Sequence, residues 1–487
     1  MPGEPVICSD LAVVGAGAAG LYAALSAASV GASVTLVSAT PLAQTASYWA
    51  QGGIAAALAV EDSLERHLAD TEAAGRNLVR RSAAQVLVRE APARVRDLEA
   101  MGVRFDADRR GVLALGLEGG HSARRVVHAG GSATGRRVVR QLSALVVDDP
   151  HIAVLEGARA TGAWLHDDGR CAGVTLEDGR AVRARATVLA TGGAAALWSR
   201  TTNPPGSLGI GMSIAHVAGA ELADLEFLQF HPTAVIGVAG REGFLVTEAI
   251  RGEGATLHGP DGERFVEELA PRDEVARAIA ALLARTGATS VGLDMRNVDP
   301  SLFPNVVSAL QDAGLDPTRE QIPVAPASHY MMGGVVTDLD GRSTVAGLYA
   351  VGETACTGLH GANRLASNSL SECFVYGARA AHAGLDEPAL ADAAAGTPPP
   401  ASALQRPARA TQQALWRDAG IVRTRTGLQR LAQDPHPLAR LIAGCALRRE
   451  ESRGAHQRVD FPRVDPELDH RHTAIGVDEQ PQTVQWT

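Results

Sequence analysis

Two histidines and two arginines stand at Gly- and Pro-marked breaks between residues 225 and 370. His231 lies in FLQFHPTAV, Arg272 in APRDEVARAIA, His329 in ASHYMMGGV and Arg364 in GLHGANRLASNSLSE. Polar groups at such breaks suit a site built from loops better than a core. Because guanidinium groups bind carboxylates through paired hydrogen bonds, the set favours a ligand with two carboxylates. Taken singly, each histidine is more often structural, and Arg272 would be an ordinary cation at a helix start.

A single acid stands in a loop that is otherwise rich in glycine and cations. The stretch GLEGGHSARR, residues 116–125, sets Glu118 among three glycines, a histidine and two arginines. One interpretation is that Glu118 neutralises Arg124 or Arg125 on a solvated loop. The other depends on the ligand, because an acid in a cationic site can accept a hydrogen bond from a positively charged group.

The elements that position such a site begin with a nucleotide-binding pattern near the N-terminus. The segment DLAVVGAGAAGLYAALSAASVGASVTLVS predicts a strand, a turn with Gly15, Gly17 and Gly20, a helix of small residues and a second strand. In this context the first glycine makes the turn, the second admits a pyrophosphate, and the third allows close packing. The helix N-terminus then faces the phosphates. The pattern predicts dinucleotide binding in a doubly wound α/β fold.

Two later segments favour FAD over NAD, whereas the residue at the end of the second strand allows only a weaker contact with ribose. The second strand ends in Ser38, where an acid usually meets the ribose of NAD. The segments ATVLATGG and GLYAVGE read as further strands that end at the same crevice, and Glu353 there could hold flavin-chain hydroxyls. A surface acid is the alternative for Glu353. The chain has no second G-x-G-x-x-G motif for a nicotinamide donor, so electrons should enter the flavin from the substrate.

Composition excludes several classes of protein. The 487 residues suffice for two or three structural units, and the net charge of −9 offers no basic field for nucleic acid or anionic membrane. No apolar run is long enough to span a bilayer and the N-terminus has no signal-peptide pattern, which predicts a cytoplasmic location. The five cysteines are scattered, so we expect no metal site. The chain contains no lysine, which excludes Schiff-base chemistry and pyridoxal phosphate.

These motifs resemble the L-aspartate oxidases of the succinate dehydrogenase/fumarate reductase flavoprotein superfamily. The resemblance covers most of residues 10–460 in the order of the family. The matching segments are GAGAAG, SYWAQGGIAAAL, EGGHSARR, EFLQFHPTA, TEAIRGEGA, PRDEVARAI, HYMMGGV, GLHGANRLASNSLSE and RREESRGAH. The segments SYWAQGGI and GANRLASNSL are particularly like the oxidase branch.

The resemblance implies an α/β architecture in three parts. A doubly wound, Rossmann-like FAD-binding domain would carry an inserted α+β capping domain and be followed by a C-terminal helical domain. The expected boundaries are 1–224 and 332–390 for the FAD-binding domain, 225–331 for the capping and substrate domain, 391–405 for a linker, and 406–487 for the helical domain.

The resemblance also assigns roles residue by residue. Arg272 matches the family's catalytic arginine, and Glu118 matches the position that meets the substrate's ammonium group. The expected substrate-binding residues are His231, Thr247, Glu248, His329 and Arg364. The expected FAD-binding residues are Gly15, Ala16, Gly17, Ala18, Ala19, Gly20, Ser38, Ser47, Gln51, Gly52, Gly53, Glu353, Ser369 and Leu370.

Two positions depart from relatives in the superfamily. Members of membrane complexes link FAD to a histidine about five residues before the QGG motif, whereas this chain has Ala46 there. We therefore expect FAD to be held non-covalently. Ser132 stands where relatives commonly have an acid, and nothing in the sequence explains this change.

The expected reaction is the FAD-dependent oxidation of L-aspartate to iminoaspartate, with O2 or fumarate as electron acceptor. In the family this product feeds quinolinate and NAD synthesis, so a quinolinate synthase is a possible partner. One alternative is a soluble fumarate reductase, which would share the dicarboxylate site and differ mainly at Glu118. A non-catalytic flavoprotein subunit is another, although the retained histidines and arginines argue against it.

Overall fold

A seven-stranded sheet forms the centre of the computed structural model, which describes residues 6–390, 398–399 and 406–486. Its strands are Val6–Val14 (β1), Val34–Ser38 (β2), Ile152–Glu156 (β6), Ala160–Leu165 (β7), Cys171–Leu176 (β8), Ala181–Leu189 (β9) and Leu348–Ala350 (β16). The order is β6-β2-β1-β9-β8-β7, and β16 pairs with the end of β9. The pairs β6–β2, β2–β1, β1–β9 and β9–β16 are parallel, so these strands all end at one edge. This confirms the doubly wound α/β class.

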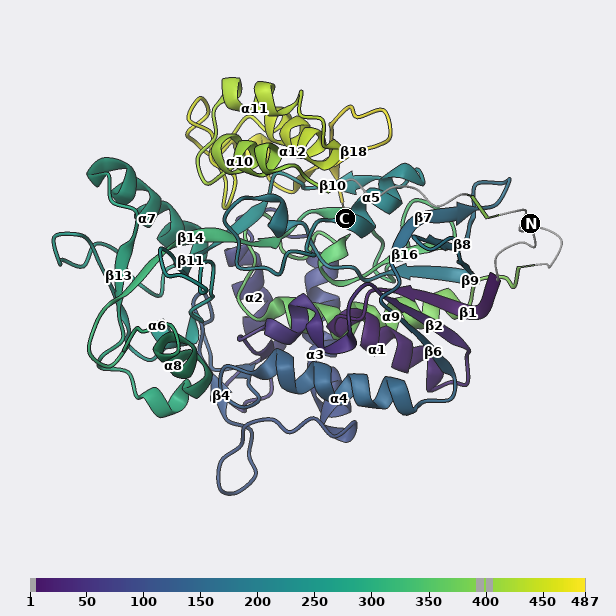
Figure 1. Ribbon diagram of the computed structural model, residues 1–487, viewed down its shortest axis with the longest axis horizontal. Helices are drawn as coiled ribbons and strands as arrows, with labels where there is room; N and C mark the ends of the chain where they lie inside the picture. Colours follow the sequence, from purple (N-terminus) through teal and green to yellow (C-terminus); the bar gives the residue numbers. More distant parts are fainter. Residues whose placement is uncertain (1–5, 391–397, 400–405, 487) are drawn as a thin grey trace.

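Helices cover this sheet in the manner of a dinucleotide-binding domain (Figure 1). The helices of this domain are Ala18–Ala28 (α1), Leu64–Ala74 (α2), Arg81–Ala100 (α3), Thr134–Asp148 (α4), Ile210–Val217 (α5) and Asn368–Leu385 (α9). Every residue of α1 is buried, and α1, α3, α4 and α9 share one hydrophobic core with β1 and β2. Small residues allow this approach: a Cβ added at Gly377 of α9 would lie 3.0 Å from Ala19 O of α1.

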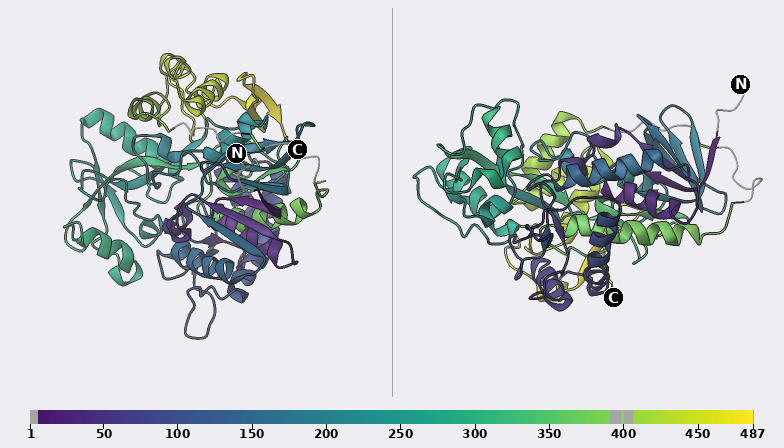
Figure 2. Two further views of the ribbon diagram at one scale, coloured as in Figure 1. Left: turned by 45° about the vertical axis from the view of Figure 1, so that its right-hand side comes forward. Right: turned by 90° about the horizontal axis from the view of Figure 1, so that it is seen from below.

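A separate lobe is inserted between β9 and β16 and projects from one end of the molecule (Figure 2). Its antiparallel sheet has the order β11-β14-β13-β12, and its helices pack on that sheet around their own apolar core. The elements are Leu228–Val235 (β11), Ala249–Gly252 (α6), Thr256–His258 (β12), Arg272–Thr286 (α7), Val291–Asp294 (β13), Pro304–Gln311 (α8) and Ile322–Met331 (β14). This is the expected α+β capping domain.

The C-terminal part is helical at first but ends in a hairpin that the sequence did not predict. Its elements are Arg409–Asp418 (α10), Arg425–Leu431 (α11), Pro437–Arg448 (α12), Arg471–Ile475 (β18) and Gln482–Gln485 (β19). β18 pairs with Leu222–Ala223 (β10) in a five-stranded sheet that also contains Gly334–Val336 (β15) and Ala355–Cys356 (β17). Helical periodicity stops at α12, whereas β-branched residues in RHTAI and QTVQ favour strands. The expected linker, 391–405, lies outside the described residues except for 398 and 399.

Short elements complete the described chain. A three-stranded sheet consists of Ile54–Ala55 (β3), Leu115–Gly116 (β4) and Val126–Val127 (β5). The 3-10 turns are Leu42–Gln44, Ala46–Trp49, Ala195–Leu197, Pro300–Leu302, Gly352–Thr354 and Pro466–Leu468. The small sheet matters for the site, because it carries the loop that contains Glu118 between β4 and β5.

Candidate active site

The turn after β1 has the geometry of a pyrophosphate-binding loop. Gly15 adopts φ +110°, and a Cβ there would overlap Ala190 O, so only glycine fits. A Cβ on Gly20 would overlap Gly15 O, which explains the close packing of α1 on β1. Gly17 caps α1 without a side-chain hydrogen bond. The positive end of α1 therefore stands at the carboxyl edge of the sheet, as a pyrophosphate requires.

Residues from distant segments reach the same edge. Ser38 ends β2, and its hydroxyl donates to Thr40 O at 2.6 Å. Ser47 Oγ accepts the Ala18 amide at 3.1 Å, so the 46–49 turn is tied to the first residue of α1. The neighbouring residues Ala16 and Ala19 are both buried. These contacts bring the first part of the expected FAD set together.

A carboxamide and a carboxyl group complete this edge. Gln51 Nε2 donates to Leu245 O at 2.7 Å, while its buried Oε1 has no partner among the described residues. Glu353 follows β16, and its Oε1 accepts the Met331 amide at 2.8 Å. Burial raises the pKa of Glu353 to about 8. A buried oxygen without a partner and a carboxyl group beside the crevice fit a ligand rich in hydroxyl and N–H groups, such as FAD.

The start of α9 faces the site and lacks the usual capping hydrogen bond from a side chain. Ser367 caps α9 but makes no cap hydrogen bond, so no cap side chain satisfies the leading N–H groups. Ser369 Oγ accepts a hydrogen bond from Arg364 Nη1 at 2.8 Å, and Leu370 is buried in the main core. This end of an 18-residue helix is suited to a polar, electron-accepting group of a cofactor.

The two expected histidines meet on adjacent strands of the capping domain. His231 on β11 and His329 on β14 have ring centroids 5.0 Å apart; His231 is buried and His329 is partly buried. The pairing of β11 with β14 is irregular on both sides of His231, and such bulges re-aim side chains near functional sites. His329 Nδ1 is 2.8 Å from Thr202 Oγ1, whereas His231 Nε2 has no partner among the described residues. The buried side chain of Thr247 comes from the segment leading into α6.

The two expected arginines meet on one neutral side chain. Gln229 Oε1 accepts from Arg272 Nη1 and from Arg364 Nη2, both at 3.1 Å. Arg272 Nε also contacts Glu248 Oε2, and Arg251 Nη2 lies 3.6 Å from the same oxygen. Arg364 stacks 4.5 Å above Tyr330 and has a buried Nε without a partner among the described residues. The arrangement leaves donors free for anions.

Positive charge dominates the electrostatics here. Burial and then the charge of Arg272 lower the pKa of both His231 and His329 well below its ordinary value, so both rings are neutral near pH 7. Burial alone would raise the pKa of Glu248, but Arg272 and Arg251 outweigh it and the pKa is lowered. Burial and the repulsion of Arg272 lower the pKa of Arg364 to about 10. A dianion bound here would relieve this repulsion.

Glu118 belongs to this cluster and pairs with neither arginine of its own loop. Its Oε2 accepts a hydrogen bond from Ser367 Oγ at 2.6 Å. Arg125 instead binds Asp62 at 2.7 Å and Asp70, so the solvated-loop interpretation is wrong. The position of Gly119 in this loop also has a structural explanation. The amide of Gly119 donates to Glu248 Oε1 at 3.0 Å, and a Cβ on Gly119 would overlap that oxygen.

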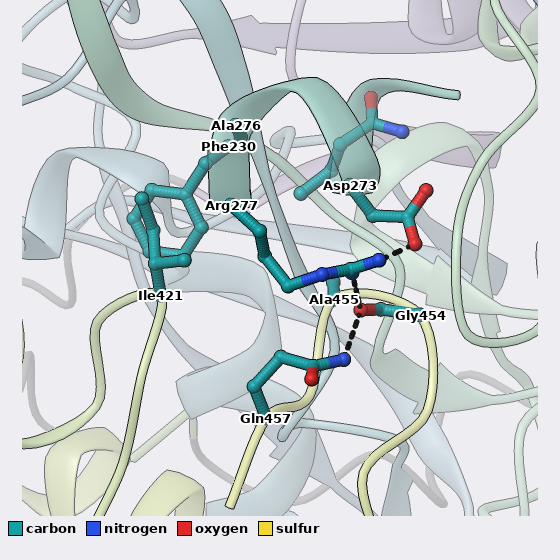
Figure 3. A pocket seen from close by; sticks show the side chains of 9 residues that line it. Phe230, Asp273, Ala276, Arg277, Ile421, Gly454, Ala455 and Gln457 are labelled. Atoms are coloured by element: carbon teal, nitrogen blue, oxygen red, sulfur yellow. Dashed lines mark hydrogen bonds and ion pairs between the residues drawn. The ribbon is translucent and has the colours of Figure 1, made fainter. Parts of the chain in front are cut away.

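Helix α7, which begins with Arg272, is anchored to both other domains. The buried Asp273 lies 3.3 Å from Arg76 of the FAD-binding domain and 2.9 Å from Arg277. Arg277 Nη1 also donates to Gly454 O of the C-terminal part at 2.9 Å, as Figure 3 shows. The small pocket in that view separates α7 from the C-terminal loop around Ala455. The position of Arg272 thus depends on three domains.

Three residues of this cluster were not assigned a role from the sequence. Gln229 and Arg251 lie within motifs that the sequence flagged, and Gln229 precedes His231 by two residues on one face of β11. Ser367 gave no signal, because its partner is 249 residues away. Conversely, His360 of the GLHGANR motif pairs with Glu372 at 2.8 Å and supports the core beneath the site.

No helix in the described part of the chain is both long and apolar enough to cross a bilayer. The same residues contain no group of three or more His, Cys, Asp or Glu side chains placed to hold a metal ion.

Family models match both the nucleotide-binding part and the tail. Residues 10–370 match an FAD-binding domain, and residues 432–487 match the C-terminal part of fumarate reductase flavoproteins. The chain is 46% identical to the L-aspartate oxidase of Caulobacter vibrioides over 93% of this chain and 94% of that one. It is 42% identical to the L-aspartate oxidase of Streptomyces coelicolor over 96% and 91%. The chain belongs to the L-aspartate oxidase family. It is an FAD-dependent oxidoreductase.

The fold of the chain is also similar to solved structures outside the L-aspartate oxidase family. The chain superposes on a single-residue variant of the E. coli quinol fumarate reductase flavoprotein with a TM-score of 0.89 at 28% identity, covering 99% of this chain and 97% of that one. Mycobacterium smegmatis Sdh1 gives 0.82 at 29% identity, covering 99% and 95%. This member of the L-aspartate oxidase family therefore shares its three-part architecture with fumarate reductase and succinate dehydrogenase flavoproteins.

Proposed function

We propose that this enzyme oxidises L-aspartate to iminoaspartate. The observation that carries the proposal is a single buried acid, Glu118, facing a cluster of arginines and histidines built for two carboxylates. Aspartate has two carboxylates and one ammonium group, which match the two halves of the site. Succinate and fumarate have no group that would require Glu118. The names of the relatives support the same substrate.

The carboxylates of the substrate would be bound by Arg364, His231 and His329, assisted by Thr247. The unpartnered Arg364 Nε and His231 Nε2 are available as donors, and both lie buried. Donors fixed in advance orient a ligand at little entropic cost. A bound dianion would also favour protonation of the two histidines, because it opposes the positive charges that lower the pKa of each ring.

Arg272 would exchange a proton with the substrate. Its Nε is held by Glu248 and its Nη1 by Gln229, whereas its Nη2 makes no hydrogen bond among the described residues. The hydrogen bond from Arg272 to Glu248 gives a proton that leaves Arg272 a path, although Arg272 and Arg251 lower the pKa of that carboxyl group. A guanidinium held in this way combines a fixed position with a route for its proton.

FAD would be held non-covalently by the turn at Gly15, Gly17 and Gly20 and by the segments that meet it. The remaining binding residues of this proposal are Ala16, Ala18, Ala19, Ser38, Ser47, Gln51, Gly52, Gly53, Glu353, Ser369 and Leu370. Ala46 stands where a covalent link would need a nucleophilic side chain. When bound, FAD supplies the two-electron redox chemistry. The residues of the chain supply binding, orientation and proton transfer.

Reoxidation by O2 or by fumarate completes the proposed cycle in the cytoplasm. Fumarate fits the same carboxylate-binding residues as aspartate, which makes it a natural acceptor. Iminoaspartate hydrolyses in water, so an enzyme that consumes it promptly, a quinolinate synthase, is the expected partner. We place the domain boundaries where β11 and β14 delimit the capping lobe, at 224/225 and 331/332.

Anaerobic mixing of the purified holoenzyme with L-aspartate or with succinate tests the substrate. Bleaching of the flavin absorbance by aspartate, at a rate well above that with succinate, is the expected result. A holoenzyme bleached by succinate and not by aspartate would instead be a fumarate reductase. Absence of bleaching with every dicarboxylate would leave a non-catalytic flavoprotein.

A further inference from the structure

We infer that Ser367 fixes Glu118 in the orientation that receives the substrate ammonium, and so sets the preference for amino acid over plain dicarboxylate. The inference rests on the proposed function, because it assumes that Glu118 meets the ammonium. Ser367 is a positioning residue in this scheme, since its hydroxyl acts on the substrate only through Glu118. Both side chains are buried, at 5% and 2% exposure.

The hydrogen bonds of the Ser367 hydroxyl have a defined direction. Its Oγ accepts the Gly53 amide at 3.1 Å and lies 2.6 Å from Glu118 Oε2. Because the amide can only donate, the hydroxyl proton is left for Glu118, and Oε2 is the acceptor. The carboxylate is thereby tied to the segment Gln51–Gly53 that is expected to line the FAD.

This hydrogen bond is made at the expense of ordinary helix capping. Serine before a helix usually has an extended backbone and bonds the amide two or three residues ahead. Ser367 instead has φ +62° and ψ −5°, a left-handed conformation, and makes no cap hydrogen bond. Such a conformation is unfavourable in a residue other than glycine and persists where surrounding contacts impose it.

Surrounding contacts hold Ser367 in this conformation. Its carbonyl accepts the Ala55 amide at 3.3 Å and the Ser371 hydroxyl at 3.4 Å. Two hydrogen bonds therefore fix the carbonyl group of Ser367. A residue placed against its local preference, with its side chain directed to a distant buried acid, is typical of a functional position.

The two oxygens of the Glu118 carboxylate differ in their hydrogen bonding. Among the described residues, only Ser367 hydrogen-bonds the Glu118 side chain, through Oε2. Its Oε1 lies 3.7 Å from the point where a Cβ at Gly52 would stand. Oε1 therefore lies next to the flavin-lining segment, where it can accept an N–H from a ligand.

The experiment compares Ser367→Ala with Ser367→Gly in the FAD-saturated holoenzyme. Both lack the hydroxyl, but glycine adopts φ +62° without strain. The measured quantity is kcat/KM for aspartate oxidation divided by kcat/KM for fumarate reduction. Because a hydrogen bond to a charged group is lost, we expect this ratio to fall roughly tenfold or more in both variants. Ser26→Ala, which removes a buried hydroxyl that donates to Tyr22 O and has no contact with Ser367 or Glu118, is the control and should keep the ratio.

A double-mutant cycle separates action through Glu118 from an independent effect. In a Glu118→Gln background, adding Ser367→Ala should change the ratio by less than about threefold, because coupled residues are non-additive. Recovery of the wild-type ratio in Ser367→Gly, an equal loss of both activities, or full additivity would each overturn the inference. If wild-type protein fails to oxidise aspartate, the proposed function fails instead. If the wild-type protein oxidises aspartate but the Ser367 variants keep the wild-type ratio, only this inference is wrong.

Discussion

At the scale of single residues, the two central arginines differ in how their charges are balanced. Arg272 and Arg364 share Gln229 Oε1, but only Arg272 also contacts a carboxylate, Glu248. Arg364 is held by two neutral oxygens and by the ring of Tyr330. An unbalanced cation binds an incoming carboxylate more strongly, whereas a cation paired to an acid is better placed to pass a proton.

Glu118→Gln should change which substrate the site prefers. Loss of one charge-assisted hydrogen bond to the ammonium costs ~1.5–3 kcal/mol, so kcat/KM for aspartate should fall roughly 10- to 150-fold. Fumarate reduction needs no partner for an ammonium and should fall by less than about tenfold. Steady-state assays of both reactions measure this selectivity, with Arg124→Gln, an exposed loop residue, as the control. Equal losses would mean that Glu118 only shapes its loop.

Arg272→Leu should remove proton transfer with little effect on binding. The change deletes a positioned proton donor and its charge, so kcat for fumarate reduction should fall by roughly 10²–10⁴. Comparing kcat with KM separates the roles, and Arg364→Leu is the matched variant in which KM should rise most. A variant of Arg272 with raised KM and wild-type kcat would mark it as a carboxylate anchor.

Binding of a dicarboxylate should take up protons. Burial and the charge of Arg272 lower the pKa of His231 and His329 in the free site, and a bound dianion raises it again. Affinity for succinate should therefore rise as the pH falls, by up to about tenfold per pH unit for each proton taken up. Calorimetry in buffers of different ionisation enthalpy measures the uptake. His329→Asn should reduce it, and pH-independent affinity without proton uptake would contradict the assignment.

At the scale of elements, those that position the site differ in how well the sequence predicts them. The β1–α1–β2 unit was predictable, because apolar runs, the glycine turn and small residues are all local signals. The irregular pairing of β11 with β14 at His231 was not, because a bulge depends on the partner strand. The role of Ser367 at the start of α9 could not be predicted for the same reason, because its hydroxyl donates to an acid that is distant in the sequence.

Asp273→Asn should loosen α7 and displace Arg272. Asp273 pairs with Arg76 and Arg277, which connect the capping helix to the FAD-binding and C-terminal parts. Since small displacements of a catalytic group are costly, kcat/KM should fall roughly 10- to 100-fold. The loss should be similar for aspartate and fumarate, because both reactions use Arg272.

Glu274→Gln is the control for this change. Glu274 neighbours Asp273 and pairs with the same Arg76 at 2.5 Å, but its side chain is 43% exposed. Exposed ion pairs contribute little, so activity should stay within about twofold. An effect of Asp273→Asn confined to aspartate would show that the helix start contacts the ammonium end of the substrate and has no anchoring role.

At the scale of the whole molecule, buried charges join the C-terminal part to the rest. Glu226 binds Arg449 at 2.6 Å, Arg449 binds Glu451 at 2.9 Å, and Glu451 binds Arg453 at 2.8 Å. Arg453 then donates to Arg76 O at 2.7 Å. The RREESRGAH motif was visible in the sequence only as a mark of the family. Its structural role depends on partners hundreds of residues away, which no local pattern reveals.

Removal of FAD should loosen this assembly reversibly. The residues proposed to hold FAD come from the first strand, the 46–53 segment, the turn after β16 and the start of α9, so the cofactor would join parts that are remote in sequence. A ligand present at 100 times its dissociation constant stabilises the folded state by about 2.7 kcal/mol. The FAD-free protein should therefore melt at a lower temperature than the holoenzyme, and added FAD should restore the original melting temperature.

Acid precipitation tests the same prediction chemically. Because Ala46 offers no atom for a covalent bond, yellow flavin should appear in the supernatant after the protein is denatured. Ala46→His is the informative companion, since it places an imidazole in the turn that is tied to α1 through Ser47. Flavin that pellets with the wild-type chain would show a covalent bond to another residue. Flavin that pellets only with Ala46→His would show that the turn already brings position 46 within bonding distance of the cofactor.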